Sequence, residues 1–140
     1  MDCPNIVGIK EASGSISQVA KLAKLAMDNL DIYSGNDDQI VPILSLGGIG
    51  VISVLSNVAP KETHDMVQEY LDNKHNNALE LQLKYLDLID SLFIEVNPIP
   101  VKAALKMLGF NVGGLRLPLT DIEENNRQIL ELELRRAGLI

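Results

Sequence analysis

The sequence predicts an α/β fold, in which three β/α units with a parallel sheet are followed by an all-helical segment. Short apolar runs alternate with helical patterns in the first half of the chain, whereas after residue 73 apolar residues recur at helical spacing only. Hydrophobic residues make up 46% and aromatic residues 4% of the chain, so its core is aliphatic, which suits helices packed on a parallel sheet. We therefore divide the chain into a sheet-forming part, 1–73, and a helical part, 74–140.

The first predicted strand is the apolar run 6–9, which ends in Lys10. Such a run is typical of a parallel strand that is buried on both faces. Lysine is rarely buried without a function, and α/β folds place their chemistry at the carboxyl ends of strands. A desolvated lysine can lose its proton near neutral pH and attack a carbonyl as a free amine. Lys10 is thus either a Schiff-base lysine or a strand-end lysine whose ammonium reaches solvent, and the pattern alone favours the second.

The remaining elements of the first part follow from local signals. Ser13 is expected to cap a helix that extends to Ala26, and Pro60 to occupy the first turn of a helix that reaches Leu71. Between them we expect strands over 31–34 and 50–55, and a helix that begins at Asp37 or Asp38 and ends at Gly47.

The second part carries helical patterns over 76–93, 101–108 and the C-terminal residues. Residues 97–100 (Asn-Pro-Ile-Pro) separate the first two helices, and Gly109 ends the second. Thr120 and Glu123 have the spacing of a capping box, which predicts that the last helix begins there.

Composition excludes several functional classes. The net charge of −7 disfavours nucleic acids and anionic membranes, and no apolar run approaches the ~20 residues that span a bilayer. The first residues lack a signal-peptide pattern, and Cys3 is the lone cysteine, so the cytoplasm is the expected compartment. His64 and His75 are isolated, and we expect neither a metal site nor a cofactor.

Five segments resemble those of one enzyme family: 8–14, 34–37, 47–54, 97–102 and 115–118. In this order and spacing they are similar to the dihydrodipicolinate synthases, aldolase-type lyases of the N-acetylneuraminate lyase superfamily. The resemblance implies a (β/α)₈ TIM barrel with a C-terminal helical domain. Because such a barrel takes about 250 residues, the chain corresponds to a partial TIM barrel, its last three β/α units, followed by the helical domain.

The resemblance also implies a chemistry. Lys10 matches the lysine that forms an imine with pyruvate; the derived enamine then attacks aspartate semialdehyde. Ile52 matches a position whose backbone contacts bound pyruvate. Gly35 matches a position that lines the same pocket, although a plain turn explains that glycine equally well. The hydroxyls of the family's proton relay and its carboxylate-binding arginine belong to the part that has no counterpart here, so we expect little turnover from the isolated chain.

Two alternatives remain open. Sister lyases that act on N-acetylneuraminate or 2-keto-3-deoxy acids share the lysine. A non-catalytic fragment that associates with itself is the other possibility. Three strands of a closed barrel expose two sheet edges and one inner face, which would be lined by Ile6, Gly8, Lys10, Ile52 and Val54. We therefore expect a homo-oligomer rather than a monomer.

Overall fold

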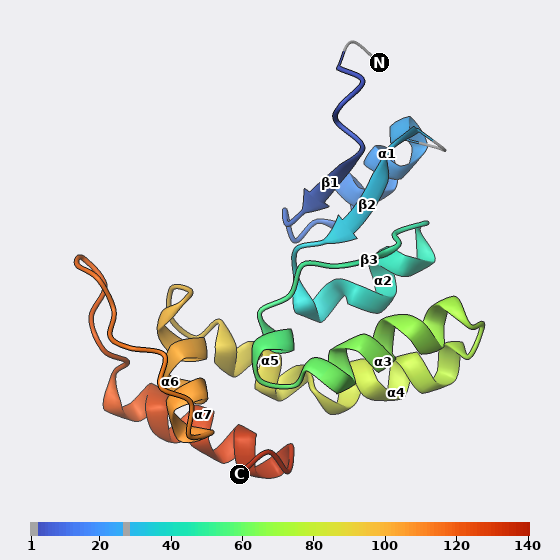
Figure 1. Cartoon of the computed structure of the whole chain (residues 1–140). Coiled ribbons are helices and arrows are strands. Elements are labelled where there is room, and N and C mark those ends of the chain that lie inside the picture. The colour runs from blue at the N-terminus through green and yellow to red at the C-terminus, as the bar shows by residue number, and fades with distance from the viewer. Residues whose placement is uncertain (1–2, 27–28) are drawn as a thin grey trace. The chain divides into compact units, whose positions relative to one another are not determined.

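A three-stranded parallel sheet forms the first part of the chain, as the sequence predicts (Figure 1). The computed structural model describes residues 3–26 and 29–140. The strands are β1 (Gly8–Glu11), β2 (Asp31–Ser34) and β3 (Gly50–Val51), in the order β1-β2-β3. Lys10 pairs with Tyr33, and Tyr33 pairs in turn with Gly50.

The chain forms two compact units. The first comprises Met1–Ser53 and His64–Gln82, and the second comprises Val54–Thr63 and Leu83–Ile140. Each unit thus consists of two segments that are separate in the sequence. The predicted division of the chain at residue 73 stays a prediction.

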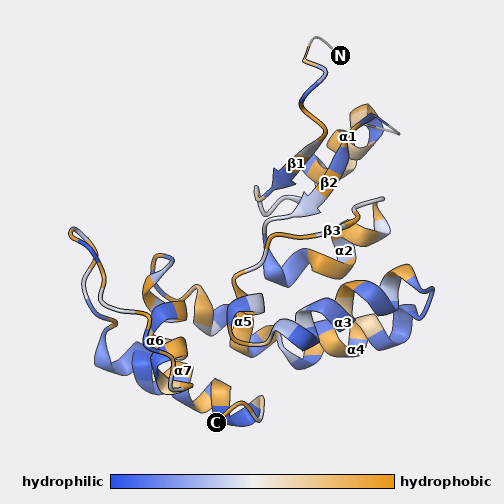
Figure 2. Cartoon of the chain, viewed as in Figure 1, coloured by the Kyte–Doolittle hydropathy of each residue, from blue (hydrophilic) through white to orange (hydrophobic). Residues whose placement is uncertain are grey.

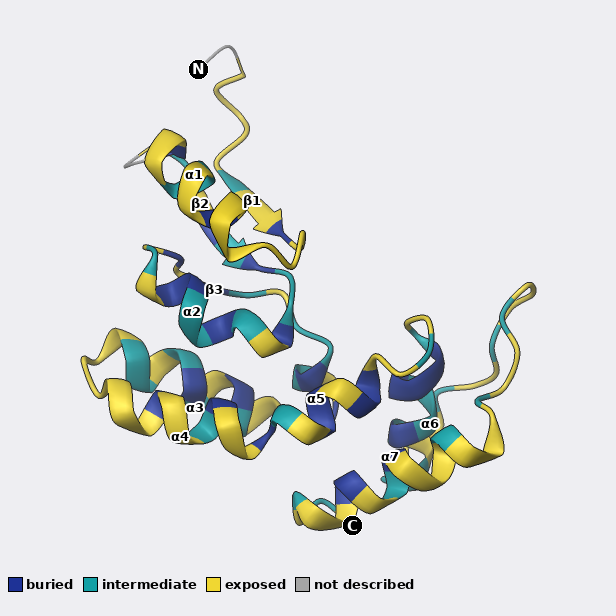
Figure 3. Ribbon diagram, turned by 180° about the vertical axis from the view of Figure 1, so that it is seen from behind, coloured by how far each residue is buried: buried dark blue, intermediate teal, exposed yellow. Residues whose placement is uncertain are grey.

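Helices cover one face of the sheet in the first unit. These are α1 (Ile16–Ala26) and α2 (Ile40–Ser45), the latter preceded by the 3₁₀ helix η2 (Asp37–Gln39). Val19 and Ala26 of α1 form a buried cluster with Ile32 of β2 and Ile43 of α2 (Figure 3). Since successive side chains of a strand alternate between faces, Ile32 points to the helices and Tyr33 to the opposite face.

Two local predictions in this unit need correction. Ser15 rather than Ser13 caps α1, because its hydroxyl oxygen lies 3.3 Å from the backbone nitrogen of Gln18. The third strand ends at Val51 instead of residue 55, and the 3₁₀ helix η3 (Leu55–Asn57) occupies the end of the predicted strand. The Asn57 side-chain amide donates to the Val54 carbonyl at 2.9 Å, which holds the chain in this turn.

The helices α3 (Pro60–Leu71) and α4 (His75–Lys84) follow. Pro60 begins α3 and Leu71 ends it, as predicted. Gln82 of α4 has a buried side chain, which accepts a hydrogen bond from the Val41 backbone N–H (3.1 Å) and donates one to the Asp37 carbonyl (2.9 Å). This one side chain satisfies two backbone groups of the η2 and α2 segment.

The second unit contains α5 (Leu86–Leu92), α6 (Ile99–Met107) and α7 (Glu124–Arg136). Apolar side chains of these helices form its core, whose buried members include Leu88, Ile89, Leu92, Ala104, Leu130 and Leu134. Figure 2 shows hydrophobic residues along the same helices. No strand occurs between residues 76 and 137, which confirms the predicted all-helical pattern of this stretch.

The helix boundaries of this region are partly as predicted. The single helix expected over 76–93 is divided at Tyr85, whose backbone is not helical (φ −97°, ψ 3°). Gly109 ends the next helix in a left-handed conformation (φ 87°), as predicted. The capping box is wrong: α7 begins at Glu124, and Glu95 accepts the hydrogen bond of the Glu123 N–H at 2.9 Å.

Candidate active site

The three residues singled out by the sequence lie at the carboxyl ends of neighbouring parallel strands. Lys10 is in β1, Gly35 directly follows β2, and Ile52 directly follows β3. The strand register places Lys10, Tyr33 and Gly50 in one row across the sheet, on the face that α1 and α2 leave uncovered. Gly35 and Ile52 come two residues after Tyr33 and Gly50, so by the same alternation they lie on the same face of the sheet, in the next row toward the carboxyl ends of the strands.

Gly35 packs directly against the side chain of Lys10. A Cβ atom at residue 35 would lie 2.9 Å from Lys10 Cε and 2.6 Å from Ala12 Cβ. The Gly35 N–H donates to the Glu11 carbonyl at 2.6 Å, which holds the two strand ends together. A residue without a side chain is therefore required here so that the lysine stem can pass.

Ile52 closes the third corner of the site. Its backbone N–H donates to the Ser34 carbonyl at 2.8 Å, so its backbone is fixed to the end of β2. Its side chain is 48% exposed on the uncovered face. The site thus combines one cation, one glycine without steric bulk and one apolar side chain, a set that suits a small carboxylate with a short carbon chain.

Tyr33 is a member of this face to which the sequence analysis gave no role. Its ring lies between two glycines: ring carbons are 3.4 Å and 3.3 Å from the positions that Cβ atoms would take at Gly8 and Gly50. The alternation of Ile32, Tyr33 and Ser34 is a signal that could have placed the ring on the same face as Lys10. Tyr33 contributes a phenol group, which can donate or accept a proton, to the row that contains the lysine.

Glu11 is a second residue that sequence reasoning passed over. It is 5% exposed and belongs to the face of β1 that α1 covers. Its Oε1 accepts hydrogen bonds from the Ser13 backbone N–H (3.1 Å) and from the Gln18 side chain (3.3 Å). Glu11 thereby fixes the loop that follows Lys10 to the first turns of α1. Its Oε2 is buried and has no hydrogen-bond partner among the described residues.

The burial predicted for β1 is wrong. Ile9 is 36% exposed and the preceding Val7 is 70% exposed. Lys10 is also exposed, as the pattern alone favoured, and β1 ends in hydrophilic residues (Figures 2 and 3). The cause is that β1 is an edge strand, so only β2 and α1 cover it. A hollow of about 500 Å³ lies along this edge, lined by residues of β1 and α1 that include Lys10, Glu11, Lys21 and Leu25.

In 3–26 and 29–140, no three His, Cys, Asp or Glu side chains gather closely enough to hold a metal ion. No helix within these ranges has the length and apolar character needed to span a membrane.

Comparison with known proteins places this geometry in a family. Residues 1–137 match the model of the dihydrodipicolinate synthetase family. The chain is 58% identical over 138 residues to the 4-hydroxy-tetrahydrodipicolinate synthase of Clostridium tetani, and the match covers 99% of this chain and 47% of that protein. It is 62% identical over 136 residues to the synthase of Caldicellulosiruptor saccharolyticus, with 97% of this chain and 46% of that protein covered.

Solved structures agree with these sequence matches. The synthase from Cyanidioschyzon merolae with lysine bound superposes with a TM-score of 0.93 at 43% identity, covering 99% of this chain and 47% of that one. The synthase from Acinetobacter baumannii complexed with pyruvate gives 0.94 at 38% identity, covering 99% and 48%. The chain spans about half the length of these relatives, and along nearly its whole extent it belongs to the dihydrodipicolinate synthetase family.

Proposed function

We propose that this chain provides the lysine-bearing part of a 4-hydroxy-tetrahydrodipicolinate synthase, which condenses pyruvate with aspartate semialdehyde in lysine and diaminopimelate biosynthesis. The observation that carries the proposal is the packing of Gly35 against the Lys10 stem at the carboxyl end of the sheet, with Ile52 beside it. Family membership and the pyruvate complex of the Acinetobacter baumannii relative support the choice of substrate.

In the proposed reaction, the neutral Lys10 amine attacks the keto carbon of pyruvate. Water leaves and an imine forms between the lysine nitrogen and that carbon. Loss of a proton from the pyruvate methyl group gives an enamine, which forms the new carbon–carbon bond with the aldehyde carbon of aspartate semialdehyde. Gly35 leaves room for the lysine stem, and the exposed Ile52 side chain offers an apolar surface to the methyl group.

We further propose that residues 1–73 are the last three β/α units of a (β/α)₈ barrel, and that 74–140 are its C-terminal helical domain. Three features support this. The carbonyl groups of Val7 and Glu11 accept hydrogen bonds from backbone N–H groups at the two ends of β2. Because alternate residues of a parallel strand bond to opposite neighbours, the backbone groups of Gly8 and Lys10 face the open edge of the sheet, where a further strand could pair. The hollow beside β1 and the unpartnered Glu11 Oε2 lie at the same edge.

Several consequences follow for the isolated chain. It is expected to act in the cytoplasm without a cofactor and to form homo-oligomers. Its turnover should be very low, because general acid–base groups typically contribute about 10²- to 10⁴-fold each, and on the uncovered face the described residues offer one phenol, that of Tyr33, beside Lys10. Imine formation demands less, since it requires only the amine and a bound keto acid.

Reductive trapping tests the lysine assignment. The chain is incubated with pyruvate and borohydride, and intact mass followed by peptide mapping locates the adduct. We expect one reduced pyruvate adduct on Lys10, and none after Lys10→Arg. Lys21→Arg is the matched control, because Lys21 lines the same hollow, and it should leave the labelling unchanged. Label on Lys21 or Lys102, or no label at all, would contradict the proposal, and the second result would favour a non-catalytic fragment.

A further inference from the structure

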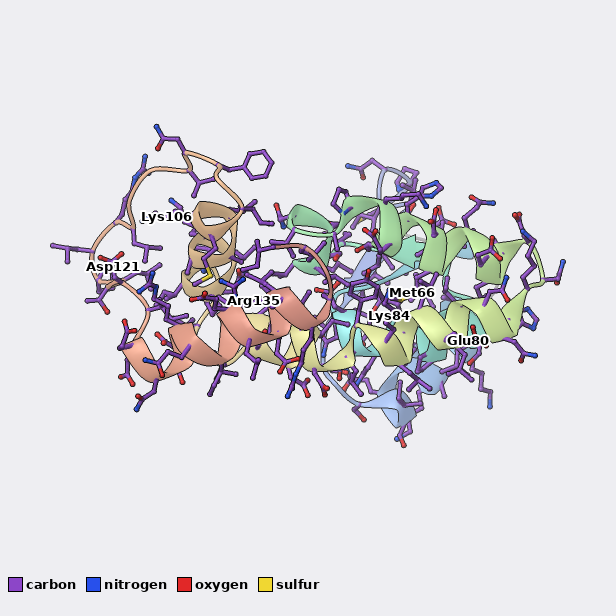
Figure 4. All side chains as sticks on the ribbon, turned by 90° about the horizontal axis from the view of Figure 1, so that it is seen from below. Met66, Glu80, Lys84, Lys106, Asp121 and Arg135 are labelled. Carbon is purple, nitrogen blue, oxygen red and sulfur yellow. The ribbon has the colours of Figure 1, made fainter. Side chains whose placement is uncertain are left out.

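A second hollow lies within the second unit, which comprises Val54–Thr63 and Leu83–Ile140. It has a volume of about 310 Å³ and is formed by α6, by the segment that leads into α7, and by the first turn of α7. Lys102 and Lys106 of α6 and Arg127 of α7 line it, together with a single carboxylate, that of Asp121. Figure 4 shows Lys106 on α6 and Asp121 on the segment that leads into α7.

This concentration of positive charge runs against the composition of the chain, which has 12 Lys and Arg against 19 Asp and Glu. Lys102 and Lys106 are four residues apart on one helix, so they share a face and repel each other, at a cost to helix stability. An anion placed between the two ammonium groups would be attracted by both of them and would offset their repulsion.

The described carboxylates do little to neutralise these cations. Neither Lys102 nor Lys106 takes part in any of the ion pairs found in 3–26 and 29–140. Lys102 Nζ donates to the Gly114 carbonyl at 2.6 Å, a neutral partner that leaves its charge unbalanced. Arg127 lies 3.5 Å from Glu124, but both side chains are more than half exposed, so this pair is weak and leaves further guanidinium N–H groups available.

The rest of the lining is apolar and indicates what else the ligand contains. Ile99, Met107, Leu115 and Ile122 contribute hydrophobic surface to the hollow. Inorganic phosphate would gain nothing from these side chains, whereas a short carbon skeleton would. The volume lies at the lower end of the range for small-molecule pockets, so the skeleton must be short. We propose that this hollow binds a small organic dicarboxylate, with one carboxylate held by the lysine pair and the other by Arg127.

The proposal is independent of the chemistry assigned to Lys10. The Lys102 bond to Gly114 already ties α6 to the extended segment after Gly109. A dicarboxylate that also contacted Arg127 would join three separate pieces of chain, so its binding should stabilise the folded protein and raise Tm.

The experiment uses the full chain, with glutarate, butyrate and inorganic phosphate as separate probes in a chloride buffer of constant ionic strength. Calorimetric titration gives Kd, and thermal unfolding gives the Tm shift. We expect glutarate to bind at least about tenfold more tightly than butyrate or phosphate, and to raise Tm. Lys106→Gln and Arg127→Gln should each weaken glutarate binding by about tenfold or more.

Lys24→Gln is the matched control, because it removes the same charge from an exposed position on α1. It should leave glutarate binding unchanged, and far-UV circular dichroism should show that all three variants are folded. Equal affinity for the three probes would indicate general anion attraction only and would overturn the proposal. So would an absence of glutarate binding, or equal effects of Lys24→Gln and Lys106→Gln. Pyruvate trapping on Lys10 should persist in Lys106→Gln, which separates this test from that of the proposed function.

Discussion

At the scale of single residues, Gly35 packs tightly against the Lys10 stem in the candidate site. Gly35→Ala would place a methyl group 2.9 Å from Lys10 Cε, closer than side-chain atoms tolerate, so the lysine stem must move. We expect trapping of pyruvate to slow by about ten- to a hundredfold, since displacements near 1 Å have effects of this size. The rate of adduct formation by mass spectrometry measures it.

Gly114→Ala provides the control for this substitution. No atom lies within 4 Å of the position that its Cβ would take, so the methyl group is accommodated there. Trapping by Gly114→Ala should match that of the unaltered chain, and circular dichroism should be the same for both variants. If Gly35→Ala trapped pyruvate at the normal rate, Gly35 would be a simple turn residue.

Ile52 was expected within a strand over 50–55, but that strand ends at Val51. The sequence was sufficient to place Lys10 and Gly35 at strand ends, because an apolar run and a glycine mark those ends directly. It was insufficient for exposure. The apolar run 6–9 was expected to be buried on both faces, but β1 is an edge strand in this chain, and no local pattern records whether a neighbouring strand is present. The buried carboxylate of Glu11 was missed for a related reason, since its partners Ser13 and Gln18 belong to a turn geometry that composition does not specify.

At the scale of elements, α7 depends on a carboxylate from elsewhere in the chain. Glu95 Oε1 accepts hydrogen bonds from the Glu123 N–H (2.9 Å) and the Asn126 side chain (2.8 Å) at the start of this helix. Glu95→Ala removes both, and we expect a loss of about 1 kcal/mol in the free energy of unfolding, the typical effect of a lost helix cap. Urea unfolding followed by circular dichroism measures it. Glu80→Ala, at an exposed position on α4, should cost much less.

The turn between α3 and α4 contains a pH-dependent contact. Asn77 donates to Glu69 Oε2 (2.7 Å) and Lys74 to Oε1 (3.1 Å). The hydrogen bond from Asn77, followed by that from Lys74, lowers the pKa of Glu69 below its ordinary value of 4.5. Its stabilising contribution is therefore fully present above pH 4.5 and is lost as the pH falls through the lowered pKa. The contact with Glu69 raises the pKa of Lys74, whose contribution is lost only as the pH rises through that raised value.

Carboxyl NMR titration should give Glu69 a midpoint below 4.5, and Asn77→Ala should bring this midpoint back toward 4.5. Asn76→Ala, at an exposed position beside it, should leave the midpoint where it was. A Glu69 midpoint at 4.5 in the unaltered chain would show that the two contacts do not persist in solution.

Helix boundaries show where local reasoning succeeds. Pro60 and Gly109 were placed correctly, because proline at a first turn and glycine at a C-terminus act through their own backbone preferences. The start of α7 was misplaced, because the cap is the carboxylate of Glu95, which accepts a hydrogen bond from the N–H group of Glu123, 28 residues later in the chain. Such a contact depends on the packing of α5 and α7, which the spacing of Thr120 and Glu123 cannot reveal.

At the scale of the whole molecule, unpaired sheet edges and exposed apolar side chains favour self-association. Ile6 is 53%, Val7 70% and Ile52 48% exposed in the sheet-containing unit. Unpaired strand edges invite pairing with another chain, and contiguous apolar surface is seldom left in water. We expect sedimentation velocity at micromolar protein and moderate salt to show dimers or larger species. Val7→Lys or Val7→Asp should shift the distribution of sedimenting species toward the monomer. A single species at the monomer mass in the unaltered chain would contradict this expectation.

The position of Tyr33 makes this residue an intrinsic fluorescent probe of the uncovered face of the sheet. The chain has no tryptophan, three tyrosines and two phenylalanines, so phenol rings dominate its near-ultraviolet emission. Tyr85 is buried and Tyr70 stacks on His75 at 4.4 Å, whereas the half-buried ring of Tyr33 lies on the uncovered face between Gly8 and Gly50. Whatever comes to cover that face, a small keto acid or another polypeptide, must change the hydration of this ring. Tyrosine emission, compared with that of Tyr33→Phe, would therefore follow the event in real time without an added dye.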